Sequence, residues 1–285
     1  MKIAILGANG HVGKALSAEL KSLCELYLFA RVSGYNQYVD LFKSEYDAII
    51  NCVGVGNSDS IKNVPLKVME VTEYFDELIH KYQSQHPTCK AIHISSGAVF
   101  GTTMEEPIDL NSGIILYPNQ LDFAYSYGMT KLYSEMKHRL SPFCNIDIRL
   151  MAFTSIFQPM DAPFFMSDVI KAIKNHTLLT ISAQDMIRDY IHPADLAQLI
   201  LCCIRKSGNT AYDTYSLAPA SKFEILKELS VNYHLEYELT DTYISTTGMK
   251  SCYYSRNHGA KDIQYQPVYS TLSGITNVLD HIMME

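Results

Sequence analysis

The stretch ILGANGHVGKAL, residues 5–16, decides the fold. It places Gly7, Gly10 and Gly13 directly after the apolar run at 2–6, where a segment with helical spacing begins. Glycines at such a turn let the backbone approach a pyrophosphate, and the free amides at the helix start bind the anion. We therefore expect a dinucleotide-binding loop, with a flexible loop of an unrelated α/β fold as the alternative.

Short apolar runs alternate with longer periodic segments through the first half of the chain. The runs that read as buried strands are 2–6, 26–30, 48–53, 91–95 and 146–150. The segments with helical spacing between them are 11–22, 65–86 and 125–141. This alternation is typical of a parallel sheet covered by helices on both faces, so we expect a doubly wound α/β Rossmann domain.

After residue 150 the alternation loosens, which indicates a smaller C-terminal α/β lobe. Helices are expected near 164–174, 193–206, 221–230 and 270–283, and strands near 178–181 and 211–217. We expect residues 1–155 to form the dinucleotide-binding domain, to which 186–218 return. Residues 156–185 and 219–285 would then form a substrate-binding lobe.

Composition excludes several classes of function. The formal charge of −7 and the lack of a long basic run argue against a nucleic-acid partner. No apolar stretch approaches the roughly 18 residues of a membrane-spanning helix. Seven cysteines without paired spacings fit a reducing compartment, and the histidines show no metal-ligand spacing. We expect a cytoplasmic protein without a metal site.

The end of the second expected strand bears on the choice of dinucleotide. NAD-binding Rossmann domains usually carry an acidic residue there, whereas this chain has Ala30 and Arg31. An arginine at this position can pair with a 2′-phosphate, which favours NADP(H) and leaves NAD(H) as the alternative. Asp40, expected on the next edge strand, is a candidate to face the adenine amino group.

The stretch YSYGMTK, residues 125–131, places Tyr127 four positions before Lys131. On a helix the two side chains share one face, and an adjacent cation lowers the pKa of a phenol from about 10. Such a pair can transfer a proton near neutral pH. The spacing occurs again at Tyr133 and Lys137, so it proves nothing alone.

Together with further motifs, the chain resembles the extended short-chain dehydrogenase/reductase family, which acts mainly on nucleotide sugars. The resemblance rests on the glycine loop, NCVG (51–54), SSGAVFG (95–101), YGMTK and RDYIHPADLA (188–197). These motifs follow the family's order and spacing over roughly residues 2 to 205. The family often dimerises through its long helices, so a homodimer is also expected.

The resemblance implies roles for particular residues. Ser96, five positions before Gly101, would polarise the substrate oxygen, Tyr127 would carry the proton, and Lys131 would lower its pKa and bind the nicotinamide ribose. The expected cofactor contacts are Gly7, Asn9, Gly10, His11, Val12, Gly13, Arg31, Asp40, Leu41, Val53, Gly54 and Lys131. The expected substrate contacts are Ser96, Gly97, Tyr127 and Arg188. Tyr133 and Lys137 would be an ordinary surface pair.

The residues after the serine separate the family's reactions. Dehydratases carry an Asp–Glu pair there, whereas this chain has Gly97 and Ala98. We expect reduction of a nucleotide-linked 4-keto-6-deoxy sugar, with a hexose 4-epimerase holding NAD as the alternative and a non-catalytic NADP-binding sensor as a weaker one. Ala152 replaces a family asparagine, and Arg256 is the sole candidate for a second diphosphate arginine.

Overall fold

The computed structural model describes residues 1–32, 35–54, 64–120, 123–241 and 250–284. At its centre lies a parallel sheet of six strands in the order β12–β7–β6–β5–β1–β2. The strands are β1 (Lys2–Leu6), β2 (Glu25–Phe29), β5 (Ala48–Asn51), β6 (Lys90–Ser96), β7 (Asn145–Leu150) and β12 (Thr210–Asp213). The expected doubly wound α/β fold is confirmed.

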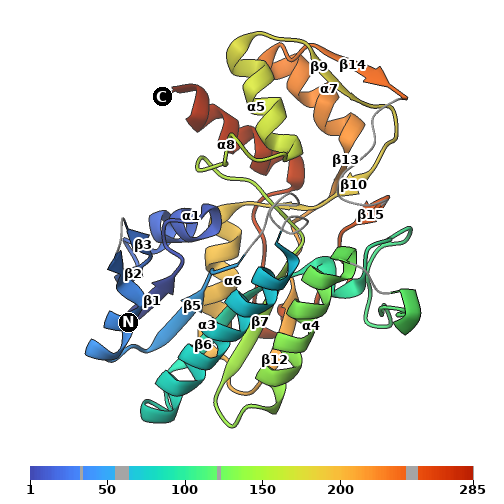
Figure 1. Ribbon diagram of the computed structural model, residues 1–285. Coiled ribbons are helices and arrows are strands. Elements are labelled where there is room, and N and C mark those ends of the chain that lie inside the picture. Colours follow the sequence, from blue (N-terminus) through green and yellow to red (C-terminus); the bar gives the residue numbers. More distant parts are fainter. Residues whose placement is uncertain (33–34, 55–63, 121–122, 242–249, 285) are drawn as a thin grey trace.

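Helices cover both faces of this sheet (Figure 1). Alternate residues of β1 point to opposite faces, since Ile3 and Ile5 belong to one core cluster and Ala4 and Leu6 to another. The helices around the sheet are α1 (His11–Leu20) and α6 (Pro193–Arg205) on one face, and α3 (Pro65–Gln85) and α4 (Phe123–Leu140) on the other. Burial on both faces explains why these strands read as continuous apolar runs.

The C-terminal lobe has a hydrophobic core of its own and lies above the sheet domain in Figure 1. Its helices are α5 (Phe165–Asn175), α7 (Lys222–Tyr233) and α8 (Thr271–Met284). Its strand pairs join β9 (Leu179–Ser182) to β14 (Tyr237–Thr240), and β10 (Ile187–Arg188) to β13 (Ala220–Ser221) and β15 (Cys252–Tyr253). The segment 186–218 contributes to both parts. Its α6 and β12 join the sheet domain, whereas its β10 pairs within the lobe. The expected division of the chain into two domains therefore stays a proposal.

Shorter elements connect these parts. They are β3 (Arg31–Val32), β4 (Tyr35–Asn36), β8 (Ala152–Phe153), β11 (Tyr190–Ile191), and the 3₁₀ helices η1 (Gln37–Lys43), η2 (Gly97–Phe100), η3 (Pro118–Gln120) and η4 (Gly259–Ile263). The expectation of an edge strand around Asp40 is wrong, because that segment is η1. Tyr38 and Leu41, three residues apart, are both buried against the core, a spacing that places them on one face of a 3₁₀ helix.

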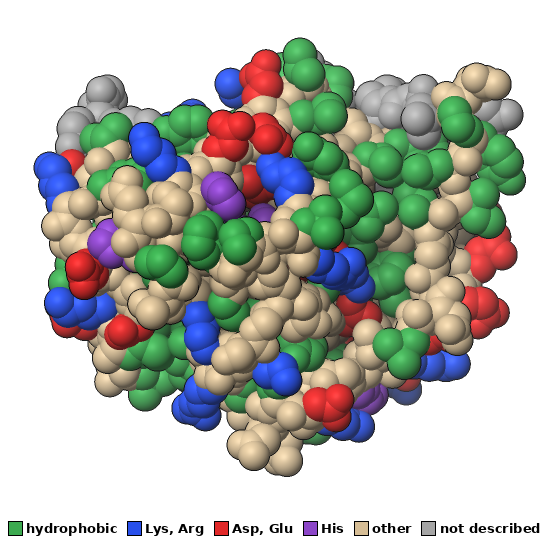
Figure 2. Space-filling model, turned by 90° about the horizontal axis from the view of Figure 1, so that it is seen from below, with side chains coloured by type: hydrophobic (Ala, Val, Ile, Leu, Met, Phe, Trp, Pro, Cys, Tyr) green, Lys and Arg blue, Asp and Glu red, His purple; other side chains and the backbone are tan. Residues whose placement is uncertain are grey.

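The surface carries both signs of charge. Figure 2 shows Lys and Arg side chains interspersed with Asp and Glu on the face in view, without merging into one basic surface. None of the helices in the described parts of the chain is long and apolar enough to cross a membrane.

Candidate active site

The glycine loop has the geometry that a dinucleotide requires. Gly7 adopts a positive φ of 78°, and its carbonyl oxygen accepts the Gly10 amide at 2.9 Å. A Cβ on Gly13 would lie 2.2 Å from that same oxygen, so only glycine permits this contact between helix and loop. Helix α1 begins at His11 without a side-chain cap, which leaves its first amides for an anion. Asn9 is exposed on the loop. These features fit a dinucleotide phosphate.

A cleft of about 1010 Å³ lies between the carboxyl ends of the strands and the C-terminal lobe. Sequence-predicted residues from five separate segments line it, as expected for the ligand site of an open parallel sheet. They are Gly10, His11, Val12, Val53, Gly54, Ser96, Tyr127, Lys131 and Arg188.

Close packing of α4 on η2 places Tyr127 beside Ser96. A Cβ on Gly128 would lie 2.4 Å from the carbonyl oxygen of Ala98, so the glycine after Tyr127 permits this approach. The side chains of Tyr127 and Ser96 are hydrogen-bonded, and Ser96 also accepts the Ala98 amide at 3.2 Å. The neighbouring Ser95 instead donates to Glu135 at 2.7 Å. The loop therefore presents one of its two serines to Tyr127.

The pKa values of Tyr127 and Lys131 differ from the expectation. Burial raises the pKa of Tyr127, which the hydrogen bond with Ser96 partly offsets. The Lys131 ammonium donates to the carbonyl oxygen of Ile94 at 3.0 Å, and burial lowers the pKa of this lysine. The predicted lowering of the Tyr127 pKa by Lys131 is not found here, because the ammonium is directed to the end of β6.

The second Tyr–Lys pair on α4 has other surroundings. The Tyr133 side chain is 50% exposed, and Lys137 lies 5.4 Å from the centre of its ring. Lys137 also pairs with Glu73 of α3 at 2.7 Å. Neither residue lines the cleft. The two pairs therefore face different sides of the helix.

Several predicted contacts lie outside the cleft lining. Arg31 is exposed on the β3–β4 hairpin. Burial raises the pKa of Tyr38, and the nearby charge of Arg31 and the bond of the Tyr38 hydroxyl to the Gly7 backbone partly offset this rise. Asp40 pairs with Lys43 at 2.5 Å. Leu41 is fully buried in the core and does not line the cleft. Thus Arg31 lies near the glycine loop, whereas Asp40 and Leu41 have structural contacts of their own.

The residue after Ser96 is enclosed by other side chains. Gly97 is buried, and a Cβ there would lie 2.4 Å from Met151 Sδ and 2.9 Å from Tyr253 Oη. Gly97 does not line the cleft, so its expected contact with substrate is not seen. Arg256, the other expected diphosphate residue, is exposed and also lies outside the lining.

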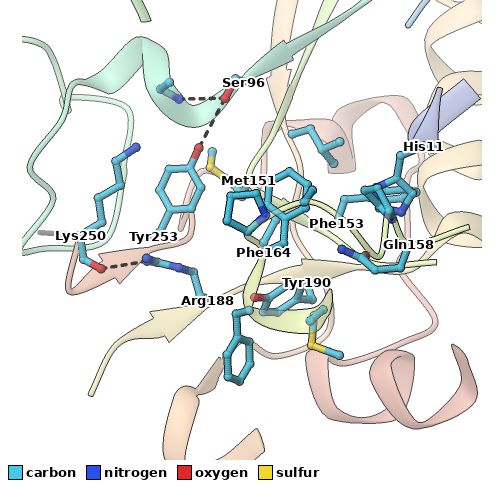
Figure 3. A pocket seen from close by; sticks show the side chains of 18 of the residues that line it. His11, Ser96, Met151, Phe153, Gln158, Phe164, Arg188, Tyr190, Lys250 and Tyr253 are labelled. Atoms are coloured by element: carbon cyan, nitrogen blue, oxygen red, sulfur yellow. Dashed lines mark hydrogen bonds between the residues drawn. The ribbon is translucent and has the colours of Figure 1, made fainter. Parts of the chain in front are cut away.

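Tyr253 and Lys250 are site residues that the sequence did not reveal. Figure 3 shows Tyr253 pointing toward Ser96, and its hydroxyl lies 3.5 Å from Ser96 Oγ. The Lys250 ammonium lies 4.4 Å, and the Arg188 guanidinium 5.3 Å, from the centre of the Tyr253 ring. Both residues come from the segment around β15, which carries no motif. Only the folded structure reveals these two residues, because β15 pairs with β10 beside Arg188.

The electrostatics of this group favour an anionic ligand. Burial and the charge of Arg188 lower the pKa of Lys250 to about 8. Burial likewise lowers the pKa of Arg188, whose guanidinium donates to the Lys250 carbonyl at 2.8 Å. Within the described parts of the chain, neither cation forms an ion pair with a carboxylate. A negatively charged group in the cleft would supply the missing counter-charge.

The remaining wall of the cleft is largely apolar and includes Phe153 and Phe164 (Figure 3). The His11 ring lies 5.0 Å from the Phe153 ring, and burial lowers the pKa of this histidine to about 4. Its buried Nε2 has no hydrogen-bond partner among the described residues. The neutral ring thus adds a hydrogen-bonding atom to an otherwise apolar wall.

One buried cluster approaches a metal-ligand set. Ligand atoms of Asp76, His93 and His138 lie within 4.8 Å of one another. However, the two ring nitrogens of His138 face carboxylates of Asp76 and Asp147 at 3.3 and 2.7 Å, which raise its pKa to about 9. A protonated imidazole has no lone pair for a metal, so we interpret the cluster as a hydrogen-bonded network.

Comparisons with known proteins show the family and the fold of this chain. The model of the "NAD dependent epimerase/dehydratase family" matches residues 3–218, while none of the curated proteins matches the chain. Among solved structures, MoeE5 in complex with UDP-glucose and NAD has a TM-score of 0.81 at 14% identity, over 100% of this chain and 99% of that one.

Two further structures share the fold over the same fractions of the chains, 100% and 99%. The UDP-glucose 4-epimerase of Thermotoga maritima, solved with UDP-glucose, has a TM-score of 0.82 at 12% identity. RMD from Pseudomonas aeruginosa, solved with NADPH, has a TM-score of 0.78 at 16% identity. Because the family model covers most of the chain, the resemblance seen in the sequence is confirmed, and this protein belongs to the NAD-dependent epimerase/dehydratase family.

Proposed function

We propose that this enzyme uses NADPH to reduce a nucleotide-linked 4-keto-6-deoxy sugar at one carbon. The observation that carries the proposal is the convergence of Ser96, Tyr127 and Lys131 on one cleft between the glycine loop and the lobe. A non-catalytic sensor would have no use for this convergence.

The side chains have separate tasks in the proposed reaction. Reduced dinucleotide, when bound, supplies the hydride. Ser96 donates a hydrogen bond to the substrate carbonyl oxygen, where negative charge develops. Tyr127, kept protonated by its raised pKa, gives its proton to that oxygen as a general acid. Lys131, one helical turn later, holds the positive charge that stabilises the phenolate left behind.

The choice of cofactor rests on the glycine loop and its neighbour Arg31. The loop would hold the pyrophosphate, and the exposed guanidinium would hold a 2′-phosphate. No acidic residue follows β2 to bind the ribose hydroxyls of NAD. Structural relatives include both NAD and NADPH complexes, so NAD(H) is the competing cofactor.

The substrate class rests on the cation pair of Arg188 and Lys250. These residues lack carboxylate partners in the described structure and lie around Tyr253, next to Ser96. The diphosphate of a sugar nucleotide would supply the opposite charge. UDP-glucose is the ligand in two structures of this fold, which supports a sugar nucleotide for this chain.

Dehydration is disfavoured by the surroundings of residue 97. Met151 and Tyr253 fill the space that a side chain there would need, and Ala98 carries no acid or base. Removal of water from the sugar requires a carboxylate pair that the cleft lacks at this point. The reaction is therefore restricted to hydride transfer at one carbon.

An epimerase is the second candidate, since structural relatives include 4-epimerases with NAD. The test incubates the purified enzyme with NADPH and a panel of UDP-, dTDP- and GDP-linked 4-keto-6-deoxy sugars. We expect one nicotinamide oxidised per sugar reduced, and protein that purifies largely free of cofactor. Retained NAD⁺ and interconversion of UDP-hexoses without a net absorbance change would show an epimerase instead.

We also propose a homodimer formed by α3 and α4. Their outer faces expose large apolar side chains, which mark interaction surfaces when they gather in patches. They include Leu66, Met69, Tyr74, Tyr133 and Met136. Light scattering after size exclusion should give twice the chain mass of 32.2 kDa. Met69→Glu combined with Met136→Glu should give the single mass.

A further inference from the structure

A largely buried arginine near the end of β7 joins three elements around the cleft. Arg149 donates to Glu135 of α4 through Nε at 3.0 Å and through Nη2 at 2.7 Å. Its Nη1 donates to Asp213, the last residue of β12, at 3.3 Å. Both carboxylate side chains are fully buried, and the Arg149 side chain is 14% exposed. The forked guanidinium therefore holds α4 against the ends of β7 and β12.

On the sheet side, Arg149 is connected to the turn that carries Ser96. Glu135 accepts a hydrogen bond from Ser95, the residue before Ser96, at 2.7 Å. The Arg149 guanidinium also lies 5.0 Å from the centre of the Phe100 ring, at the end of η2. One side chain thus contacts both the helix α4 and the turn that packs on it.

On the lobe side, the contacts continue into residues 250–257, which we call the lobe segment. Asp213 Oδ2 accepts hydrogen bonds from Ser255 Oγ at 2.7 Å and from Asn257 Nδ2 at 3.3 Å. Ser255 is buried and lies two residues after Tyr253, whose hydroxyl points toward Ser96 (Figure 3). We call this connection the arginine path, and its members are Ser95, Glu135, Arg149, Asp213 and Ser255.

Backbone contacts also place the lobe segment beside the residues that follow η2. Isolated β-bridges join Met104 to Lys250 and Ile108 to Ser255. Met104 and Ile108 form a small apolar core, against which Tyr253 packs. The bridges fix the register of the two segments, whereas the arginine path fixes the lobe segment against the ends of the sheet strands.

We propose that Arg149 is a positioning residue, which couples binding on the lobe side of the cleft to the placement of Ser96 and Tyr127. A nucleoside diphosphate held by Lys250 and Arg188 would order the lobe segment. The arginine path would then transmit this order to the turn at Ser96 and to α4. The inference rests on the proposed function, because it takes the anionic ligand of the lobe side to be a nucleoside diphosphate.

The charges of the path make it a permanent connection. Arg149 and Arg139 supply two positive charges, which balance the negative charges of Glu135 and Asp213. Arg139 lies 3.3 Å from Glu135, and its side chain is 43% exposed. Burial lowers the pKa of Arg149, but the hydrogen bonds and charges of Glu135 and Asp213 raise it by more. The arginine therefore stays charged, and the path does not open as pH changes.

Such a connection has a use in the proposed reaction. Ser96 ends β6 and Tyr127 belongs to α4, so the local chain does not fix their relative position. Misplacement of reacting groups by about 1 Å can cost roughly 100-fold in rate. Binding energy from a part of the substrate that does not react can serve to place these groups correctly.

The alternative is that the path only supports the fold. Ser255→Ala and Asp213→Asn interrupt the path toward the lobe segment, and both leave the Arg149–Glu135 pair and the backbone bridges in place. Arg139→Ala is the matched control, because Arg139 also pairs with Glu135 but is not a member of the path. Ser255→Ala removes a single hydroxyl group, so it also serves if Asp213→Asn does not fold.

The decisive measurement is amide hydrogen exchange, followed by mass spectrometry, with and without UDP, dTDP or GDP. These ligands lack the sugar that would reach Ser96. In wild type, the ligand should slow exchange in the lobe segment and also in residues 96–101. In Ser255→Ala and Asp213→Asn, the lobe segment should still be protected, whereas the slowing at 96–101 should fall by about threefold or more.

Turnover gives a second measurement. With the fastest keto sugar of the panel, both variants should lower kcat by about tenfold and leave KM nearly unchanged, because Ser96 and Tyr127 are misplaced while the diphosphate contacts remain. Arg139→Ala should match wild type in both the exchange and the turnover measurements. Full ligand-induced slowing at 96–101 in both variants, or an equal loss in Arg139→Ala, would overturn the coupling.

Failure of the proposed function would be visible separately. If none of the three nucleotides protects the lobe segment of wild type, the proposed substrate class fails. NADPH then tests the path from the sheet side, because a coupling between two sites is reciprocal. It should slow exchange in the lobe segment of wild type and Arg139→Ala but not of Ser255→Ala, and equal slowing in all three would contradict the path.

Discussion

The two sides of the cleft are built in different ways. On the sheet side, the glycine loop, Ser96 and the Tyr127–Lys131 pair come from short motifs at strand ends and helix starts. On the lobe side, Arg188 and Tyr253 come from two-residue strands that meet only in the folded chain, and Lys250 lies just before the second of these strands. In the proposed function, the first side would hold a cofactor shared by many enzymes, and the second would hold a particular substrate.

This difference leads to an expectation about mutations. Groups that carry out chemistry on the sheet side should control turnover, because their contributions arise in the transition state. Groups on the lobe side should control affinity and selectivity, because they contact parts of the substrate that do not react. Three substitutions in the cleft test this division, and Arg31→Ala beside the glycine loop tests the cofactor contact; they follow from the largest expected effect to the smallest.

Tyr127→Phe should lower turnover by ~10²–10⁴, the range typical of a positioned proton donor. The substitution removes the hydroxyl that is hydrogen-bonded to Ser96 and keeps the ring. Tyr133→Phe is the matched control on the same helix, since Tyr133 is half-exposed and lies outside the cleft. Its rate should stay within a few-fold of wild type, and similar losses in the two variants would reject the assignment of Tyr127.

The position of this tyrosine in the cleft shows what a sequence can predict. The fold and the sheet side were predictable because Gly7, Gly13 and Gly128 each satisfy a local steric requirement that leaves its mark on the sequence. Asp40 was misplaced because the short stretch YVDLF was read as an edge strand, whereas the common burial of Tyr38 and Leu41, three residues apart, needs the spacing of a 3₁₀ helix. The Tyr127 pKa was misjudged because burial and the Ile94 carbonyl, which spacing does not reveal, decide it.

The residues on the lobe side could not be predicted from the sequence, because their contacts also depend on the folded structure. Lys250 and Tyr253 lie more than sixty residues beyond Arg188, and β15 pairs with β10 over only two residues. A contact of this kind depends on the packing of the whole lobe.

Arg31→Ala should weaken NADPH binding by roughly 1.5–3 kcal/mol, the usual contribution of a charge-assisted hydrogen bond. NADH lacks the 2′-phosphate, so its affinity should hardly change. Fluorescence titration of both cofactors measures the difference. Equal loss for the two would mean that Arg31 does not contact the phosphate, and the cofactor preference would then have to come from another residue.

The affinity for UDP-glucose should fall as pH rises above about 8. The pKa of Lys250 is lowered to about 8, so its charge is present below that pH and lost above it. The diphosphate stays ionised throughout this range, and Arg188 keeps its charge. Calorimetry at pH 7 and pH 9 should show a loss of up to about tenfold, the factor set by one titrating group over that interval.

Two variants test whether Lys250 causes this step in affinity between pH 7 and pH 9. Lys250→Gln should bind more weakly at pH 7 and show no further loss at pH 9. Lys171→Gln should keep the step, because Lys171 lines the same cleft but lies 4.0 Å from the carboxylate of Asp168. A step that persists in Lys250→Gln would place the anion-binding charge elsewhere.

Tyr253→Phe should have the smallest effect, and it tests the division between the two sides most directly. Burial raises the pKa of Tyr253 to about 12, so its hydroxyl stays protonated and acts as a hydrogen-bond donor rather than a base. Loss of one neutral hydrogen bond costs about 0.5–1.5 kcal/mol, which corresponds to a rise in KM of roughly 2–12-fold with kcat nearly unchanged. The phenylalanine ring keeps the surface on which Lys250 and Arg188 lie, and Tyr254→Phe is the control outside the cleft. If kcat instead fell as far as in Tyr127→Phe, Tyr253 would be a second proton carrier, and the chemistry would be shared by both sides of the cleft.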